Sequence, residues 1–272
     1  MNDKKNYLIQ TADGTSTLFL EEYDQTMHSD SGAYEESLLK HVYPSGVLKL
    51  HQKNINVLDI GFGLGYNVLA LIYEFQKTNK NSTLNIVSLE KDKTLHPFIK
   101  KIKFNDDRDI IYSFIRDVYL EGKGSMGNIN LEILFGDGRE FLKEMSGIKF
   151  DAVFQDPFSP SKNPEMWSVE YFSCINKLMS ESAILTTYSS ADHIRMAMIE
   201  AGLKTGIGPS VGRKREGTLA SKSELPELLP EERIRQITGN IKSEPYRDFR
   251  LSMEREEILS ERLERIRARK LK

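Results

Sequence analysis

The sequence predicts an α/β protein built on a parallel, doubly wound sheet. Three observations lead to this prediction: short apolar runs alternate with helical stretches, a glycine-rich turn follows one of these runs, and acidic residues end several others. The length agrees with it, because 272 residues suffice for one large domain or for one domain with an appendage.

The first residues are predicted to form structure ahead of this sheet. Residues 6–22 alternate loosely, and Asp13-Gly14 lies between two short extended runs, which indicates a β-hairpin. Residues 30–50 carry apolar side chains at helical spacing, so a helix is expected there, and Pro44 is expected to end it.

The remaining elements follow the alternating pattern. Five apolar runs are predicted as strands, at residues 55–60, 84–89, 131–135, 150–154 and 183–188. Helices are predicted after the glycine turn and beyond, at residues 68–75, 91–102, 139–145, 169–179 and 191–201. Residues 105–130 are polar and are expected to form a helix and a surface loop, and residues 218–221 an edge strand.

Composition excludes several classes of protein. No apolar run approaches the ~18 residues that a membrane span needs, and the start is polar, so we expect a cytoplasmic protein without a membrane partner. Cys174 is the one cysteine, which excludes an intramolecular disulfide and a thiolate metal cluster. The five histidines are scattered, so no metal site is expected.

Composition changes at about Ser223, where prolines interrupt short segments, and residues 223–272 are termed the C-terminal extension. Residues 231–272 hold twelve Lys and Arg against nine Asp and Glu, a net charge of +3. Residues 248–270 are predicted as one charged helix with an apolar stripe of Leu251, Ile258, Leu259, Leu263 and Ile266. Two roles stay open for this helix: docking on the protein body, or contact with RNA.

The glycine turn is the first motif that carries chemistry. Asp59-Ile-Gly61-Phe-Gly63-Leu-Gly65 lies between a predicted strand and a predicted helix. Its glycines would let a ligand approach the backbone closely, and Asp59 would face an ammonium group. S-adenosylmethionine fits both features, because it has an aminocarboxypropyl tail and no pyrophosphate.

Acids also end the next two strands. Glu90 ends the second, where a carboxylate can accept hydrogen bonds from ribose hydroxyls. Gly136 and Asp137 end the third, where Asp137 can accept from an adenine amine while the glycine admits the ring. Three acids at successive carboxyl ends predict a cleft for an adenosylmethionine-type nucleoside.

The fourth strand ends in Asp156-Pro157-Phe158-Ser159-Pro160, and the prolines hold Asp156 at the strand tip. A carboxylate there can accept a hydrogen bond from an amine nucleophile, direct its lone pair and take up its proton. The sequence therefore predicts Asp156 as the catalytic residue.

Two further stretches are candidates for substrate contact. Trp167, in the loop that begins at Lys162, is expected either to stack on a base or to anchor the loop. Arg213, Lys214 and Arg215 form a basic cluster that could neutralise RNA phosphates, or could be a solvated turn.

The segments FDAVFQDPFSPSKNPEMWSVEYF and GRKRE, together with LDIGFGLGYN, resemble the methyltransferase domain of the MnmC family from about residue 7 to 222. The resemblance implies a class I, Rossmann-like methyltransferase that converts 5-aminomethyluridine, or its 2-thio form, to 5-methylaminomethyluridine at the tRNA wobble position with S-adenosylmethionine. It implies an N-terminal entry segment (1–54) and a methyltransferase core (55–222), followed by the C-terminal extension.

The resemblance also assigns residues. It places the family's catalytic aspartate at Asp156. The candidates for contact with tRNA are Phe158, Lys162, Trp167 and the basic cluster. The resemblance places the cofactor on two sets, Asp59, Gly61, Gly63, Gly65, Glu90, Gly136 and Asp137 in the core, and Gly32, Tyr34 and Glu36 in the entry segment. Family members read DGFAP where this chain has DPFSP. We expect a stand-alone monomer without the FAD-dependent oxidase domain and without a metal.

Three alternatives stay open. One is a methyltransferase for another RNA or DNA amine, although the loop at Asp156 lacks the second proline of enzymes that act on exocyclic base amines. Another is a polyamine aminopropyltransferase, which the basic cluster opposes because a polyamine is itself cationic. The third is a non-catalytic RNA-binding protein on a methyltransferase-like scaffold, which would not need all four acids.

Overall fold

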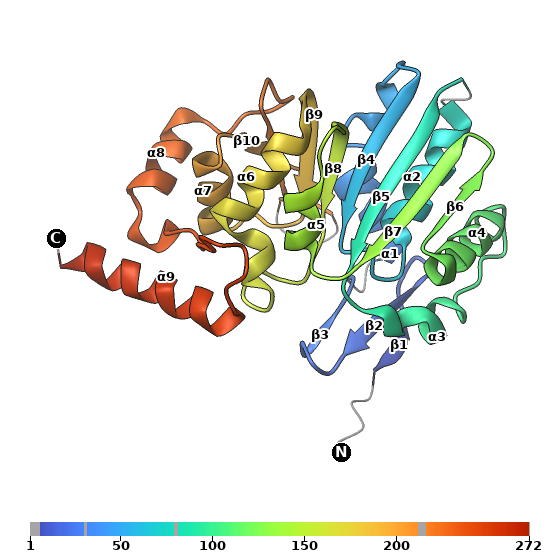
Figure 1. Cartoon of the computed structure of the whole chain (residues 1–272), viewed down its shortest axis with the longest axis horizontal. Helices are drawn as coiled ribbons and strands as arrows, with labels where there is room; N and C mark the ends of the chain where they lie inside the picture. Colours follow the sequence, from blue (N-terminus) through green and yellow to red (C-terminus); the bar gives the residue numbers. More distant parts are fainter. Residues whose placement is uncertain (1–5, 30–31, 79–80, 212–215, 272) are drawn as a thin grey trace.

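The computed structural model describes residues 6–29, 32–78, 81–211 and 216–271, and its centre is an eight-stranded sheet. The strands follow the order β10-β11-β9-β8-β4-β5-β7-β6, and the part from β9 to β6 can be followed in Figure 1. Strands β4, β5, β7, β8 and β9 are parallel, whereas β6, β10 and β11 pair antiparallel with their neighbours. Because the chain starts in the middle at β4 and later fills both sides, the predicted doubly wound α/β fold is confirmed.

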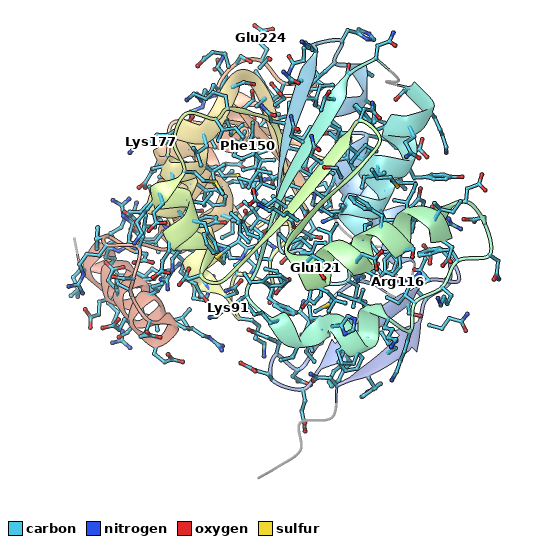
Figure 2. All side chains as sticks on the ribbon, turned by 45° about the vertical axis from the view of Figure 1, so that its right-hand side comes forward. Lys91, Arg116, Glu121, Phe150, Lys177 and Glu224 are labelled. Atoms are coloured by element: carbon cyan, nitrogen blue, oxygen red, sulfur yellow. The ribbon has the colours of Figure 1, made fainter. Side chains whose placement is uncertain are left out.

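Five strands, β4, β5, β7, β8 and β9, lie close to the predicted apolar runs, whereas the strand at residues 218–221 lies inside the sheet and not at its edge as predicted. The large sheet consists of β4 (Asn54–Ile60), β5 (Thr83–Glu90), β6 (Lys123–Met126), β7 (Ile129–Phe135), β8 (Phe150–Gln155), β9 (Met179–Thr187), β10 (Lys204–Ile207) and β11 (Thr218–Ser221). In Figure 2, Phe150 at the start of β8 lies toward the upper end of the sheet, and Lys91, just after β5, lies toward the lower end. The carboxyl ends of the parallel strands therefore open downward in this view.

Helices cover both faces of the sheet (Figure 1). The longer ones are α1 (Ala33–Ser37) with the π-helix η1 (Leu38–Val42), α2 (Tyr66–Thr78), α4 (Arg108–Glu121), α5 (Gly138–Glu144), α6 (Val169–Leu178), α7 (Asp192–Glu200), α8 (Glu231–Gly239) and α9 (Arg255–Lys270). Shorter turns are η2 (Val47–Lys49), η3 (Lys93–Leu95), α3 (His96–Ile99), η4 (Pro164–Trp167) and η5 (Ile241–Ser243). Helices α1, α2 and α4 pack on one face, and α5, α6 and α7 on the other.

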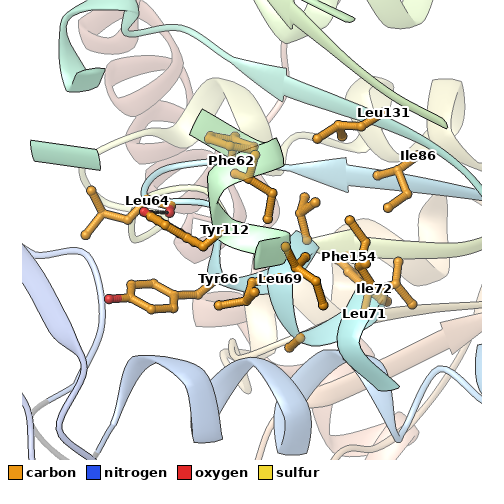
Figure 3. Close-up of a cluster of buried hydrophobic side chains, with 14 of the residues drawn as sticks. Phe62, Leu64, Tyr66, Leu69, Leu71, Ile72, Ile86, Tyr112, Leu131 and Phe154 are labelled. Atoms are coloured by element: carbon orange, nitrogen blue, oxygen red, sulfur yellow. Dashed lines mark hydrogen bonds between the residues drawn. The ribbon is translucent and has the colours of Figure 1, made fainter. Parts of the chain in front are cut away.

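Alternation along the strands produces these two layers. In β4, Val57 packs toward α2, whereas its neighbour Leu58 packs toward the opposite layer. Figure 3 shows the first layer, where side chains of α2, β5 and β7 meet. A buried phenol in this layer, Tyr112, donates a hydrogen bond to the carbonyl of Leu64 at 2.8 Å. This bond ties α4 to the turn that begins α2.

The entry segment forms the predicted hairpin and one more strand. Strands β1 (Tyr7–Gln10) and β2 (Ser16–Leu20) pair antiparallel around Gly14, and β3 (Gln25–Thr26) extends this small sheet. Figure 1 shows the small sheet below the lower end of the large one. The entry segment therefore lies over the carboxyl ends of the central strands.

One predicted loop is a strand. The GKGSMG stretch within residues 105–130 was expected on the surface as a loop, but β6 pairs antiparallel with β7 through a turn at Gly127. That glycine has a φ of +61°, which suits a tight hairpin connection. The polar composition of β6 reflects its position at the edge of the sheet, where one side of the strand faces solvent.

The C-terminal extension docks on the body, and its helix begins later than predicted. Residue 248 was expected to start the helix, but α9 begins at Arg255 because Leu251 has a φ of +53° in the preceding turn. Ile258 is fully buried in the apolar cluster that also contains side chains of α6 and α7, whereas Leu263 of the predicted stripe is half exposed. Three arginines of α9, Arg262, Arg265 and Arg269, bind the segment around Glu244.

Two further elements have no counterpart in the sequence prediction. Strand β10 and helix α8 both lie in stretches of mixed polarity, where neither period is clear. In the described parts of the chain, none of the helices is both long enough and apolar enough to cross a membrane.

Candidate active site

A cavity of about 790 Å³ lies at the carboxyl ends of β4, β5, β7 and β8, between these strands and the small sheet. Eight of the predicted site residues line it: Glu36, Gly61, Gly63, Glu90, Gly136, Asp137, Asp156 and Phe158. These residues are up to 122 positions apart in the sequence, and the parallel strands bring them to one edge.

The glycine turn after β4 forms one wall. Gly61 has a φ of +87°, and a Cβ atom there would lie 2.6 Å from the carbonyl oxygen of Asp156. Gly63 has a φ of +55° and exposes its backbone to the cavity. Gly65 does not line the cavity, because it packs under the Phe62 ring, 2.9 Å from where a Cβ would sit.

Glu90 ends β5 and braces this turn. Its Oε2 accepts a hydrogen bond from the Gly63 N–H at 2.8 Å, and its Oε1 accepts from the Asp92 N–H at 2.7 Å. Burial raises the pKa of Glu90 above its usual value. Each oxygen keeps a lone pair, so the carboxylate can still accept from a pair of ligand hydroxyls.

Asp137 caps the next element. It follows Gly136, lines the cavity and accepts hydrogen bonds from Arg139 through the backbone N–H at 2.9 Å and the guanidinium at 2.7 Å. Although burial alone would raise it, these bonds to Arg139 hold the pKa of Asp137 below its usual value. Asp137 is therefore an ionised acceptor at neutral pH.

Asp156 lies at the tip of β8, partly exposed to the cavity. Its Oδ2 accepts a hydrogen bond from the Asn67 amide at 3.0 Å, and its Oδ1 lies 3.5 Å from Nε2 of His41. His41 is buried in the π-helix, and its Nδ1 is 2.9 Å from the Thr186 hydroxyl. Both oxygens of Asp156 thus have partners that fix the plane of the carboxylate.

Asp59 does not reach the cavity, which corrects the expectation that it faces a ligand ammonium group. It is fully buried below the glycine turn, where Oδ2 accepts from the Ser88 hydroxyl at 2.6 Å. The Asn67 amide, 3.4 Å away, lies between Asp59 and Asp156. The reason is position: Asp59 is still inside β4, so its side chain points into the layer beneath α2.

This burial makes stability depend on pH. Burial raises the pKa of Asp59 to about 7 in the folded chain. In the unfolded chain its pKa is about 3.9, so as the pH rises the unfolded chain loses this proton at a lower pH than the folded chain does. The carboxyl therefore lowers the free energy of unfolding as the pH rises from about 4 to about 7. We expect Asp59→Asn to flatten this slope and to raise the free energy of unfolding at pH ~8. Urea denaturation across this range tests it, and an unchanged slope would contradict the assignment.

The entry segment contributes one predicted residue directly. Glu36 lines the cavity and accepts from the Ser29 backbone and hydroxyl at 3.0 and 2.8 Å. Gly32 and Tyr34 do not line it, contrary to expectation. Gly32 packs on the carboxyl of Asp13, where a Cβ would lie 2.4 Å away. The Tyr34 ring packs instead against the Arg108 guanidinium, whose Cζ atom lies 4.7 Å from the ring centroid.

The loop after β8 divides into an exposed and a buried part. Phe158 lines the cavity and stacks on Tyr23 with ring centroids 4.1 Å apart. Trp167 is fully buried and donates from Nε1 to the Phe158 carbonyl at 2.9 Å. It therefore anchors the loop, and the alternative that it stacks on a base is wrong. Lys162 does not line the cavity.

The anchoring role of Trp167 predicts a stability effect. Trp167→Phe removes the indole N–H and leaves the Phe158 carbonyl without that donor, which should cost about 1–3 kcal/mol of unfolding free energy. Binding of S-adenosylhomocysteine should change little, because Trp167 does not line the cavity. Urea denaturation and calorimetric titration measure the two effects. A large loss of affinity with unchanged stability would contradict the anchor.

Sequence reasoning missed several residues of this site. Tyr23, Met27 and Tyr188 line the cavity, while Asn67 and His41 hold Asp156. Asn67 ends the LDIGFGLGYN segment, but that segment does not reveal its contact with Asp156. The other four residues lie in apolar or mixed stretches and reach the site through tertiary packing. Arg213, Lys214 and Arg215 lie outside the described residues.

The donor set fits the group that the sequence predicts. Two carboxylates, Glu90 and Asp137, face the cavity beside the bare backbone at Gly61, Gly63 and Gly136. That is the chemistry a cationic nucleoside with ribose hydroxyls and an adenine amine requires. Among the residues described, no group of three His, Cys, Asp or Glu could hold a metal ion.

Known proteins match both the sequence and the fold. The sequence profile of a family described as S-adenosyl-L-methionine-dependent methyltransferase matches residues 113–223. The crystal structure of MNMC2 from Aquifex aeolicus superposes with a TM-score of 0.88 at 32% identity, over 98% of this chain and 87% of that one. The chain belongs to the MnmC2 family. It is an S-adenosylmethionine-dependent methyltransferase, and the resemblance noted from its motifs is confirmed.

Curated relatives of this MnmC2-family chain differ in length. An uncharacterized protein of Methanocaldococcus jannaschii is 34% identical over 269 residues, covering 96% of this chain and 73% of that protein. The tRNA 5-methylaminomethyl-2-thiouridine biosynthesis bifunctional protein MnmC of Leptospira interrogans is 31% identical over 224 residues, covering 75% of this chain and 33% of that protein. The chain thus spans about a third of the bifunctional relative.

A more distant match shows the fold alone. A probable spermidine synthase from Corynebacterium glutamicum superposes with a TM-score of 0.51 at 12% identity, over 93% of this chain and 97% of that one. The α/β architecture of the MnmC2 family is therefore shared with proteins of other activity.

Proposed function

We propose that this chain methylates the amine of 5-aminomethyluridine, or its 2-thio form, at the wobble position of tRNA, giving the 5-methylaminomethyl product. The observation that carries the proposal is Asp156, a carboxylate held by Asn67 and His41 at an acidic cavity. Relatives of the chain are named for 5-methylaminomethyl-2-thiouridine biosynthesis, which supplies the substrate class.

The charge of the cavity supports an amine substrate. Among the described lining residues, carboxylates far outnumber cations, with Glu22, Glu36, Glu90, Asp92, Asp137, Asp156 and Glu165 against Lys91. Such a lining attracts a cationic amine and repels phosphate. The nucleobase with its aminomethyl group would therefore enter, while the tRNA backbone stays outside.

The proposed chemistry needs one positioned carboxylate. When bound, S-adenosylmethionine supplies an electrophilic methyl group. Asp156 accepts a hydrogen bond from the substrate ammonium and takes up its proton, which frees the nitrogen lone pair for attack. The hydrogen bond from Asn67, at 3.0 Å, fixes the orientation of the Asp156 carboxylate. The fixed carboxylate then directs the nitrogen lone pair of the substrate toward the methyl group.

An aromatic pair at the cavity would hold the base. Tyr23 of the entry segment and Phe158 after β8 stack with their planes 11° apart, and both line the cavity. A flipped-out wobble base can stack on the open face of such a pair, since single-stranded RNA bases are commonly held on aromatic rings. The proposal takes a cytoplasmic monomer, without FAD, as the acting species.

Parallel assays on different substrates test the proposal against its alternatives. We expect labelled methyl transfer from S-adenosylmethionine to tRNA carrying 5-aminomethyluridine, and none to the same tRNA with an unmodified wobble uridine. Putrescine with decarboxylated S-adenosylmethionine tests aminopropyl transfer, and methylation of the unmodified tRNA would indicate a base-amine methyltransferase. Binding of tRNA without any transfer would leave only the RNA-binding alternative.

A further inference from the structure

We propose that the C-terminal extension takes part in cofactor recognition, with Asp248 as a positioning residue that acts through Arg139 on Asp137. The inference rests on the proposed role of Asp137 as the acceptor for the adenine amine. It assigns a task to a part of the chain that the methyl-transfer chemistry itself does not use.

Arg139 joins two carboxylates that lie 111 positions apart. Its Nη2 donates to Oδ2 of Asp137 at 2.7 Å, and its Nε lies 3.1 Å from both Asp137 oxygens. Its Nη1 donates to Oδ2 of Asp248 at 2.7 Å and to the carbonyl of Met253 at 2.9 Å. The Nε and Nη2 edge of the guanidinium thus binds Asp137 at the cavity, whereas Nη1 binds Asp248 of the C-terminal extension.

Asp248 is built into its place. It is fully buried, and its backbone N–H donates to the Glu170 carboxylate at 2.7 Å. Its Oδ1 accepts from the backbone N–H groups of Ser252 and Met253 at 2.9 and 3.0 Å, which shapes the turn before α9. The other oxygen remains for Arg139. A charge buried this deeply is stable only with such a partner.

The arrangement determines how Asp137 faces the cavity. Arg139 is itself mostly buried, so the orientation of its guanidinium depends on these two carboxylates rather than on solvent. With Asp248 holding Nη1, the Nε and Nη2 edge is directed at Asp137, and the carboxylate is held in one plane. Loss of the Asp248 charge would leave Arg139 with one carboxylate and would allow this pair to reorient.

The chain offers an isosteric variant and a matched control. Asp248→Asn can keep the turn, because its Oδ1 still accepts from Ser252 and Met253. It places an uncharged amide, instead of a carboxylate, against the Arg139 guanidinium. Glu244→Gln weakens another ion pair of the same extension, the one with Arg265 and Arg269, and Glu244 contacts neither Arg139 nor the cavity. Both changes remove one charge.

Binding without catalysis provides the readout. Calorimetric titration would compare S-adenosylhomocysteine with S-inosylhomocysteine, in which a carbonyl replaces the adenine amine. In Asp248→Asn we expect the dissociation constant for S-adenosylhomocysteine to rise about tenfold, while that for the inosyl analogue changes little. Glu244→Gln should leave both constants, and hence their ratio, unchanged.

Other results would overturn the proposal. An unchanged ratio in Asp248→Asn, whether both constants rise together or neither moves, would show that the extension does not act on Asp137. If Asp248→Asn does not fold, the double variant Arg139→Met with Asp248→Asn removes the buried charges together and should also lose discrimination. Since no tRNA is present, failure of the proposed tRNA substrate would not affect this result.

Discussion

Asp156→Ala is expected to lower kcat for methyl transfer about 10²–10⁴-fold while leaving the affinity for S-adenosylhomocysteine nearly unchanged. The carboxylate receives the amine proton and directs the nitrogen, so its loss affects the transition state more than the bound ground state. Single-turnover rates on tRNA carrying 5-aminomethyluridine measure the first quantity, and calorimetric titration measures the second.

The same strand supplies the control for this variant. Asp151 lies near the start of β8, where its Oδ2 accepts from the Asn56 N–H at 2.9 Å, far from the cavity end. Asp151→Ala should lower stability slightly and leave the single-turnover rate intact. A rate in Asp156→Ala within a factor of about three of the wild type would show that another group receives the proton.

Gly61→Ala is expected to have the second large effect, on both folding and catalysis. A Cβ at Gly61 would meet the backbone of Asp156 at 2.6 Å, and its φ of +87° already disfavours a side chain. The clash must displace the tip of β8, and a shift near 1 Å at a reacting group can cost about 10²-fold in rate. We expect kcat/KM to fall by at least that factor.

Gly147→Ala separates the clash from the backbone strain. Gly147, on the loop before β8, has a φ of +74°, and no atom lies within 4 Å of the position that an added Cβ would take. Both variants carry the left-handed strain of about 1–2 kcal/mol, but only Gly61→Ala meets the Asp156 backbone. Equal losses of stability, measured by urea denaturation, together with equal rates would contradict the tight approach of the two segments.

The sequence allowed the fold and three acids of the site to be predicted, because these depend on local patterns. Short apolar runs between helical stretches locate the central strands, and parallel strands bring their carboxyl ends to one edge. Glu90 is the last residue of β5, and Asp156 directly follows β8. Asp59 lies one residue inside β4, and the direction of its side chain depends on a strand end that no sequence pattern locates to one residue.

Tertiary packing accounts for what could not be predicted. Trp167 lies in a polar loop, where the sequence left both stacking on a base and anchoring open, and the Phe158 carbonyl and neighbouring rings enclose it. The link from Arg139 to Asp248 spans 109 positions, and nothing local distinguishes either residue from a solvated charge. In the same way, no sequence pattern distinguishes His41, which comes close to Asp156 only in the folded chain.

Mass analysis of nucleosides from treated tRNA tests the central claim most directly. The enzyme and S-adenosylmethionine would be incubated with tRNA carrying 5-aminomethyluridine, and in parallel with tRNA carrying 5-carboxymethylaminomethyluridine. We expect 5-methylaminomethyluridine from the first tRNA and an unchanged nucleoside from the second. An unchanged 5-aminomethyluridine, under conditions where the cofactor binds, would contradict the assignment of this cavity to the wobble amine.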